Sequence, residues 1–401
     1  MFVRWPSLTR ALAPALLALS SSADQNVFLS GVPDYEWHAG CFGTASGILM
    51  GFWDRHGLPH IYTGPTGGGV APMTSYSFQG NIGIRSLWAS QAGLDGRPAG
   101  QLGHMDNYWE APSAFESTGA DPYLVAGRAE HAPDCIGDFM GLSQNKWADL
   151  GGEVNGNING YAYNFWDPLG GRLVNFQPPP QGVTPVRDIQ SGLREFARYR
   201  GYEATVVSQL ADFTPNLPSG GFTFKNLKAE IDAGYPVMLI LQDVSRKNRS
   251  LPGNTRANPE MHAMVAYGYL TSDSTGQNFV RYRTSWASGD TIFSPWDHGI
   301  WQANLPLLGV VTFRPQPRIT SVDREDGMVR ITWQGPSSVV EDFGAGSTQA
   351  AHWYVVERAT AIDGNFVPLN APTSELAVTV SASSSPSEFY RVHLFHRAEL
   401  Q

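Results

Sequence analysis

One cysteine stands at the start of a helical pattern, where a thiol could act as a nucleophile. The chain holds two cysteines in 401 residues, and Cys41 lies in the stretch EWHAGCFGTASGILMGFWDRHG. Apolar residues such as Ile48 and Phe52 follow at helical spacing, and DRHGLP supplies a glycine and a proline that end a helix. Because a helix N-terminus favours negative charge, the position predicts a lowered thiol pKa and main-chain amides able to donate to an oxyanion.

A nucleophilic cysteine needs a base, which is usually a histidine distant in sequence. Among the ten histidines, His262 stands at the entrance of MHAMVAYGYL, an apolar strand pattern that follows a polar loop. A polar ring at the edge of a sheet is placed like a functional group. An ordinary core or surface histidine is the alternative interpretation, and the helix-start cysteine favours the functional one.

The elements that must position these two residues follow in order along the chain. DIQSGLREFARYRGY and FKNLKAEIDAGY predict helices, each followed by a strand pattern, EATVVS and PVMLILQD. The patterns FVRYRTSW and LGVVTFRP predict further strands after the histidine strand. Residues 24–313 are therefore expected to form one α+β domain, with a helical N-terminal part and a largely antiparallel sheet.

A proline-containing linker, RPQPRI, separates this domain from the C-terminal part of the chain. Beyond it, MVRITWQGP, WYVVERAT, ELAVTVSAS and SEFYRVHLF alternate like short strands. Residues 314–401 are therefore expected to form a small all-β sandwich. The pattern over about residues 316–397 resembles a fibronectin type III-like module. Three alternatives stay open for it: binding of a protein, binding of a carbohydrate, or no binding role.

The first 23 residues predict a secretory signal. Arg4 and Arg10 precede an apolar run that is too short to span a bilayer, and small residues follow it. Removing this segment changes the formal charge from −9 to −11, which argues against nucleic acid or an anionic membrane as a partner. We expect an extracellular or periplasmic protein without a membrane span.

Two segments together resemble a known family of enzymes. GVPDYEWHAGCFGTASGILMGFWDRHGLP, with AGYPVMLILQD and MHAMVAYGYL, is similar to papain-superfamily cysteine peptidases of the bacteriocin-leader-processing type, peptidase family thirty-nine. The resemblance spans roughly residues 28–313. It implies a papain-like fold, Cys41 as the nucleophile and His262 as the general base and acid. It also implies hydrolysis of a peptide or related amide bond in a peptide or protein substrate, through a thioester.

The chain departs from the family's pattern at two positions. The family orients its histidine with an Asp or Asn just before a tryptophan, where this chain has Thr284 in RYRTSWASGD. Asp290 is expected as the third catalytic residue, because the turn after the tryptophan could fold it back, with Asp297 as the alternative. The family's second oxyanion donor, a glutamine six residues before the cysteine, is replaced by Tyr35.

Other interpretations stay open at this point. His38, Trp37 or a backbone amide could replace the missing oxyanion donor, or the site could be weakened. A disulfide between Cys41 and Cys135 would end the peptidase interpretation, whereas a buried thiol at Cys135 would leave it intact. The second function class is a non-catalytic secreted binding protein that keeps a papain-like scaffold and uses the sandwich as an interaction module.

No metal or cofactor is expected. His56 and His60 are four residues apart, but Gly57 and Pro59 forbid the regular helix that would align them as a zinc pair. The sequence also has no P-loop, dinucleotide fingerprint or serine-centred elbow.

Overall fold

The computed structural model describes separate segments of residues 24–313 and nearly all of residues 314–401. The described residues are 24–35, 41–62, 70–74, 136, 139, 189–212, 221–242, 261–272, 275–285, 292–296, 305–396 and 399. The expected signal at 1–23 lies outside them, as do Cys135, Asp290 and Asp297.

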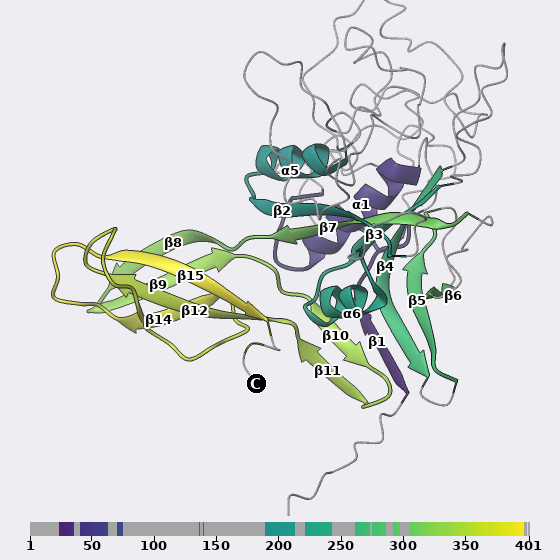
Figure 1. Ribbon diagram of the computed structural model, residues 1–401. Helices are drawn as coiled ribbons and strands as arrows, with labels where there is room; N and C mark the ends of the chain where they lie inside the picture. The colour runs from purple at the N-terminus through teal and green to yellow at the C-terminus, as the bar shows by residue number, and fades with distance from the viewer. Residues whose placement is uncertain are drawn as a thin grey trace, which may run out of the picture.

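An antiparallel sheet of nine strands forms the framework (Figure 1). Its main path runs β11-β10-β1-β4-β3-β7-β2, and β5 pairs with β4 while β6 pairs with β5. The strands are β1 (Gln25–Leu29), β2 (Ala204–Leu210), β3 (Val237–Gln242), β4 (Met261–Ser272), β5 (Gln277–Arg283), β6 (Ile292–Pro295), β7 (Leu307–Pro315), β10 (Val339–Asp342) and β11 (Ser347–Ala350). The expected α+β class with a mostly antiparallel sheet is confirmed.

Strand β4 carries His262 and pairs with three other strands of this sheet, β1, β3 and β5. Its first half pairs with β3, with His262 opposite Leu241, and its second half pairs with β1, with Gly268 opposite Phe28. The run VMLILQ in β3 is apolar because the strand lies between two neighbours, and its residues from Val237 to Leu241 are fully buried. The start of β4 is thereby fixed in a rigid core.

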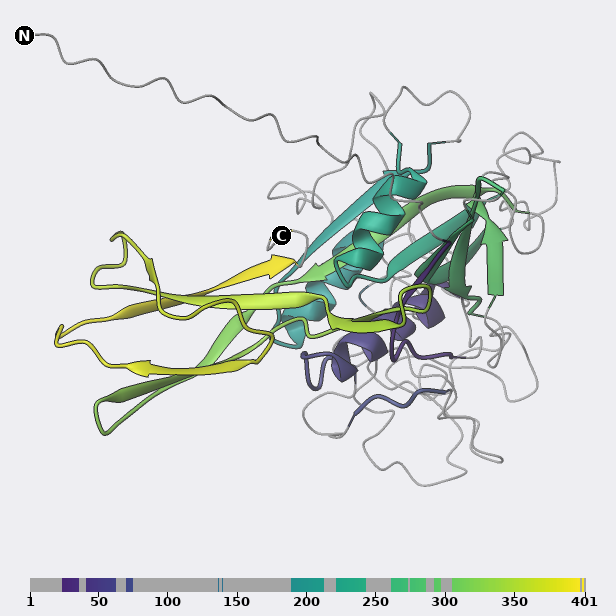
Figure 2. The same ribbon diagram turned by 90° about the horizontal axis from the view of Figure 1, so that it is seen from below.

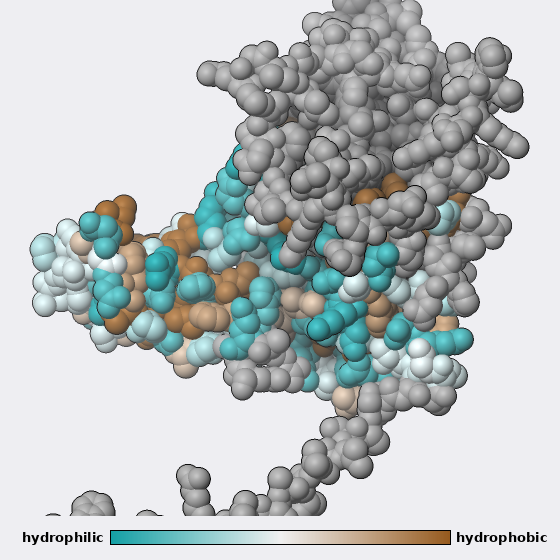
Figure 3. All heavy atoms as spheres, viewed as in Figure 1, coloured by the Kyte–Doolittle hydropathy of each residue, from teal (hydrophilic) through white to brown (hydrophobic). Residues whose placement is uncertain are grey.

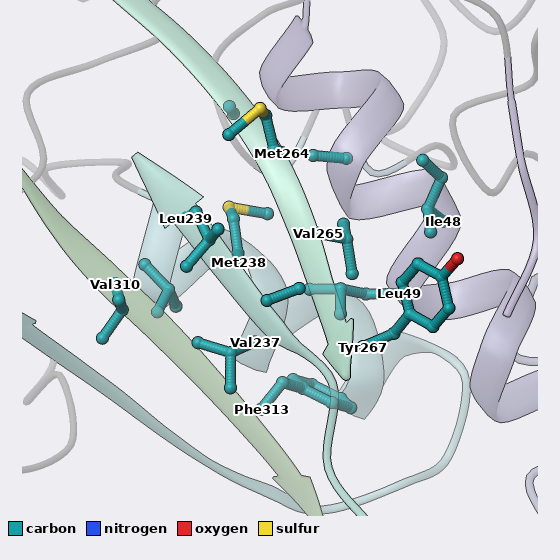
Figure 4. Packing of buried hydrophobic residues seen from close by; sticks show 14 of the residues in the cluster. Ile48, Leu49, Val237, Met238, Leu239, Met264, Val265, Tyr267, Val310 and Phe313 are labelled. Atoms are coloured by element: carbon teal, nitrogen blue, oxygen red, sulfur yellow. The ribbon is translucent and has the colours of Figure 1, made fainter. Parts of the chain in front are cut away.

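Among the described residues, three helices lie against the sheet, α1 (Cys41–Arg55), α5 (Ile189–Tyr199) and α6 (Phe224–Asp232). Helices α1 and α6 cover opposite faces, as the two views in Figures 1 and 2 show. Every residue of α1 except Arg55 is buried. Figure 4 shows Ile48 and Leu49 of α1 beside Val265 and Tyr267 of β4. This packing fixes the N-terminus of α1 relative to β4.

The C-terminal part of the chain contributes a sandwich of two three-stranded sheets, which extends from one side of the main sheet (Figure 1). One sheet has the order β14-β9-β8 and the other β13-β12-β15. The strands are β8 (Arg318–Glu325), β9 (Met328–Gln334), β12 (His352–Ala359), β13 (Val367–Pro368), β14 (Ala377–Ser381) and β15 (Phe389–His396). Trp333 and Tyr354 fill its small core, and Figure 3 shows further apolar residues at its surface.

The C-terminal segment does not contribute only to the sandwich. The hairpin β10–β11 lies between β9 and β12 in sequence, yet it pairs with β1 of the main sheet, with Val27 opposite Asp342 and Leu29 opposite Val340. The range 314–401 therefore contributes two strands to the sheet that was expected within 24–313. None of the helices in the described part of the chain is long and apolar enough to cross a membrane.

Candidate active site

Cys41 is the first residue of α1, and its side chain lies against the start of β4. The residue is 2 % exposed and its thiol is free. Main-chain hydrogen bonds reach the sulfur from Ala263, from Cys41 itself and from Phe42, and all three favour the thiolate. Because Ala263 directly follows His262, the fold brings the thiol to the main chain beside the predicted base.

Burial decides the protonation state of Cys41. Desolvation raises the pKa of the thiol to about 11, although the three main-chain hydrogen bonds act in the opposite direction. The lowered pKa expected from the helix N-terminus was therefore wrong, because the cost of burying a charged sulfur exceeds the gain from nearby amides. With this pKa, roughly one molecule in 10⁴ carries a thiolate at neutral pH.

His262 is the second residue of β4 and is 1 % exposed. Its Nε2 lies 2.6 Å from the carbonyl oxygen of Thr284. A carbonyl only accepts, so Nε2–H is the donor, and in the neutral ring Nδ1 carries the lone pair. Burial lowers the pKa of His262 to about 4, and the hydrogen bond to Thr284 opposes this shift. The ring is therefore neutral at pH 7, with Nδ1 as its basic nitrogen.

The group that orients His262 is a main-chain carbonyl. Thr284 occupies the position where the family resemblance leads one to expect an Asp or Asn, and its carbonyl oxygen accepts from the histidine in place of a side chain. Such a partner fixes the tautomer as a carboxylate or amide would, but brings no negative charge. Asp290, the expected third residue, lies outside the described residues.

Tyr35 is far from the thiol. Its hydroxyl donates to the carbonyl oxygen of Pro72 at 2.8 Å, and its ring packs so closely on Gly51 that a Cβ there would lie 2.5 Å from the hydroxyl. Gly51 follows Cys41 by ten residues, which is about 15 Å along a helix. Tyr35 is therefore a packing residue, while His38 and Trp37 lie outside the described part of the chain.

His56 and His60 follow one another closely at the end of α1. The imidazole of His56 packs against the ring of Phe52 at a tilt of 40°, with centroids 4.4 Å apart, and burial lowers its pKa to about 4. His60 follows in a left-handed backbone conformation, with φ of 69°. Within the described ranges, no group of three His, Cys, Asp or Glu side chains is placed to hold a metal ion.

Sequence reasoning singled out Cys41 and His262 but not the main-chain groups beside them. The amide of Ala263 and the carbonyl of Thr284 act through the backbone, so their residue types carry no signal. Ser285, which follows Thr284, has φ of 59°, a conformation that is uncommon for residues other than glycine. A serine in the middle of TSW gives no hint of that turn.

No family model matches the chain, and no match is found among curated proteins or solved structures. The roles of Cys41 and His262 must therefore be argued from their own geometry and chemistry.

Proposed function

We propose that the protein is a secreted cysteine peptidase or amidase whose N-terminal domain has a papain-like fold, with Cys41 as nucleophile and His262 as general base. One observation carries the proposal. The Cys41 thiol lies at a helix N-terminus against the main chain of Ala263, which directly follows His262 in β4, and Nε2–H of that histidine donates to Thr284. Within the described residues Nδ1 makes no hydrogen bond to the sulfur, so the mechanism requires the imidazole to approach the thiol when substrate binds. A thiol, a histidine of fixed tautomer and convergent amides are the groups that acyl transfer requires.

In the first half of the reaction, Nδ1 of His262 removes the proton from Sγ of Cys41 as the sulfur attacks the substrate's carbonyl carbon. The carbonyl π electrons move onto oxygen, and the main-chain N–H groups of Cys41 and Phe42 donate to the resulting oxyanion. When the tetrahedral intermediate collapses, the C–N bond breaks and the His262 imidazolium gives its proton to the leaving amine. The product is a thioester on Cys41.

In the second half, Nδ1 of His262 removes a proton from a water molecule that attacks the thioester carbonyl. The C–S bond then breaks, the acid leaves, and the proton returns to the sulfur of Cys41. During both halves the imidazolium keeps its Nε2–H bond to the carbonyl of Thr284, which stabilises the positive charge through a dipole.

The resting pair is a neutral thiol and a neutral imidazole, because the pKa of Cys41 is raised to about 11 and that of His262 is lowered to about 4. Proton transfer must therefore accompany the attack instead of preceding it. This is general-base catalysis, in which the driving force comes from the forming C–S bond and from the oxyanion donors.

The same protonation states favour a second candidate function, a non-catalytic secreted binding protein. A buried neutral thiol reacts slowly, and the glutamine donor of the resembled family is replaced by Tyr35, which packs elsewhere. In this alternative the papain-like domain is a scaffold and the sandwich binds a protein or a carbohydrate.

Hydrolysis of a peptide library by the secreted protein distinguishes the two functions. We expect cleavage by the wild type and by Cys135→Ala, and loss of cleavage in Cys41→Ala and His262→Ala. Circular dichroism and thermal unfolding of each variant test whether it is folded. Cleavage that survives Cys41→Ala in a folded protein would remove this residue from the mechanism, and a wild type that cleaves nothing would favour the binding protein.

A further inference from the structure

Ser285 adopts an unusual backbone conformation directly beside the group that orients His262. Its φ is 59°, in the left-handed region that L-residues other than Asn and Asp rarely adopt. The residue is completely buried, so the conformation is not that of a loose surface turn. Strained residues of this kind persist only where the surrounding structure holds them, and they gather at functional sites.

The hydroxyl of Ser285 does not explain the conformation. Within the part of the chain that the structure describes, Oγ of Ser285 has no hydrogen-bond partner although it is buried. A serine that makes a local side-chain hydrogen bond can offset the left-handed strain, but this one does not. What matters at this position is therefore the direction of the backbone.

The peptide group that His262 contacts lies where the chain leaves strand β5 and enters the turn at Ser285. Val265 of β4 pairs with Arg283 at the end of β5, so continuation of this register would place Thr284 opposite Met264. Instead, the strand ends at Arg283 and the chain bends at Ser285. The carbonyl of Thr284, which shares a peptide plane with the nitrogen of Ser285, faces Nε2 of His262 at 2.6 Å.

We propose that Ser285 is a positioning residue, whose left-handed backbone turns the Thr284 carbonyl onto His262 and thereby keeps the lone pair of the imidazole on Nδ1. The turn at Ser285 and the tautomer of His262 can be tested whether or not the protein is an enzyme. Its catalytic consequence rests on the proposed function, because Nδ1 is the nitrogen that would accept the thiol proton of Cys41.

Backbone preferences provide a direct test. Ser285→Gly removes the penalty for positive φ and should keep the turn. Ser285→Val is β-branched and strongly disfavours positive φ, so it should release the Thr284 carbonyl. Ser208→Val is the matched control, because Ser208 is also buried with an unpartnered Oγ but lies in β2 without a positive φ.

The readout is the tautomer of His262, measured by two-bond ¹H–¹⁵N correlation NMR on full-length protein labelled with ¹⁵N-histidine and assigned with His262→Gln. We expect Nε2–H in the wild type, in Ser285→Gly and in Ser208→Val. In Ser285→Val we expect a mixture or Nδ1–H. If Ser285→Val does not fold, Ser285→Ala serves instead, since alanine also disfavours positive φ.

Two results would overturn the proposal. One is a wild type with Nδ1–H, and the other is an unchanged tautomer in the folded Ser285→Val or Ser285→Ala protein. If the wild type also cleaves peptides, Ser285→Val should lower kcat/KM by about 100-fold relative to the Ser208→Val control, as expected for misplacement of a base. Absence of peptide cleavage would contradict the proposed function but leave the tautomer test valid.

Discussion

Acidification should destabilise this protein through His262. The imidazole is buried and neutral, with a pKa of about 4 in the folded chain against an ordinary value of 6.5. Between these two values the unfolded chain binds a proton that the folded chain does not. The contribution of His262 is therefore fully present above pH 6.5 and is lost as the pH falls towards 4. Between about pH 7.5 and 4.5, the loss amounts to about 2–3 kcal/mol in the free energy of unfolding.

His262→Gln isolates this contribution, because glutamine has no proton to gain and its amide can still donate to the carbonyl of Thr284. His56 and His352 also have pKa values lowered by burial, but both remain in the variant, so their effects cancel in the comparison. Urea unfolding of both proteins at several pH values gives the two curves. The wild-type curve should fall more steeply below pH 6.5, whereas parallel curves would show that His262 is not buried and neutral.

Two further predictions concern the thiol and the packing at the end of α1. In a Cys135→Ser background, iodoacetamide should alkylate Cys41 about tenfold faster for each pH unit between about 7 and 10, because the thiolate is the reactive form and its fraction limits the rate. Mass spectrometry measures the rate of alkylation. A plateau in the rate below about pH 9 would contradict the high pKa of the thiol. Gly57→Ala should lower the melting temperature much more than Gly327→Ala. Both glycines have positive φ, but of the two only Gly57 has a close neighbour, the carbonyl of Gly335, which an added Cβ would overlap. Equal losses of melting temperature would argue against this close approach.

Local patterns were sufficient to predict the elements that carry the two side chains. Helix α1 begins at Cys41 and ends at Arg55, where the apolar spacing stops before Gly57 and Pro59. Strand β4 begins at Met261, as its apolar run indicates. These features depend on residues near one another in sequence, and hydrophobic periodicity and helix-ending residues act over that range.

Long-range effects could not be predicted in the same way. The hairpin β10–β11 lies in sequence between two strands of the sandwich, and nothing in its residues indicates that Asp342 pairs with Val27. The pKa of Cys41 depends on burial by distant elements, which outweighs the local effect of the helix N-terminus. The Thr284 carbonyl is a backbone group, so its role depends on the turn at Ser285 and not on the identity of its side chain.

Trapping of the covalent intermediate is the most direct test of the claim that Cys41 is the nucleophile. The protein is mixed with a peptide that it cleaves, quenched rapidly in acid, and digested for mass spectrometry of the fragment that contains Cys41. We expect the acyl part of the substrate on Cys41 in the wild type and in Cys135→Ala, and no adduct in Cys41→Ala. Cleavage with no acyl group on Cys41, or with the acyl group on another residue, would contradict the mechanism.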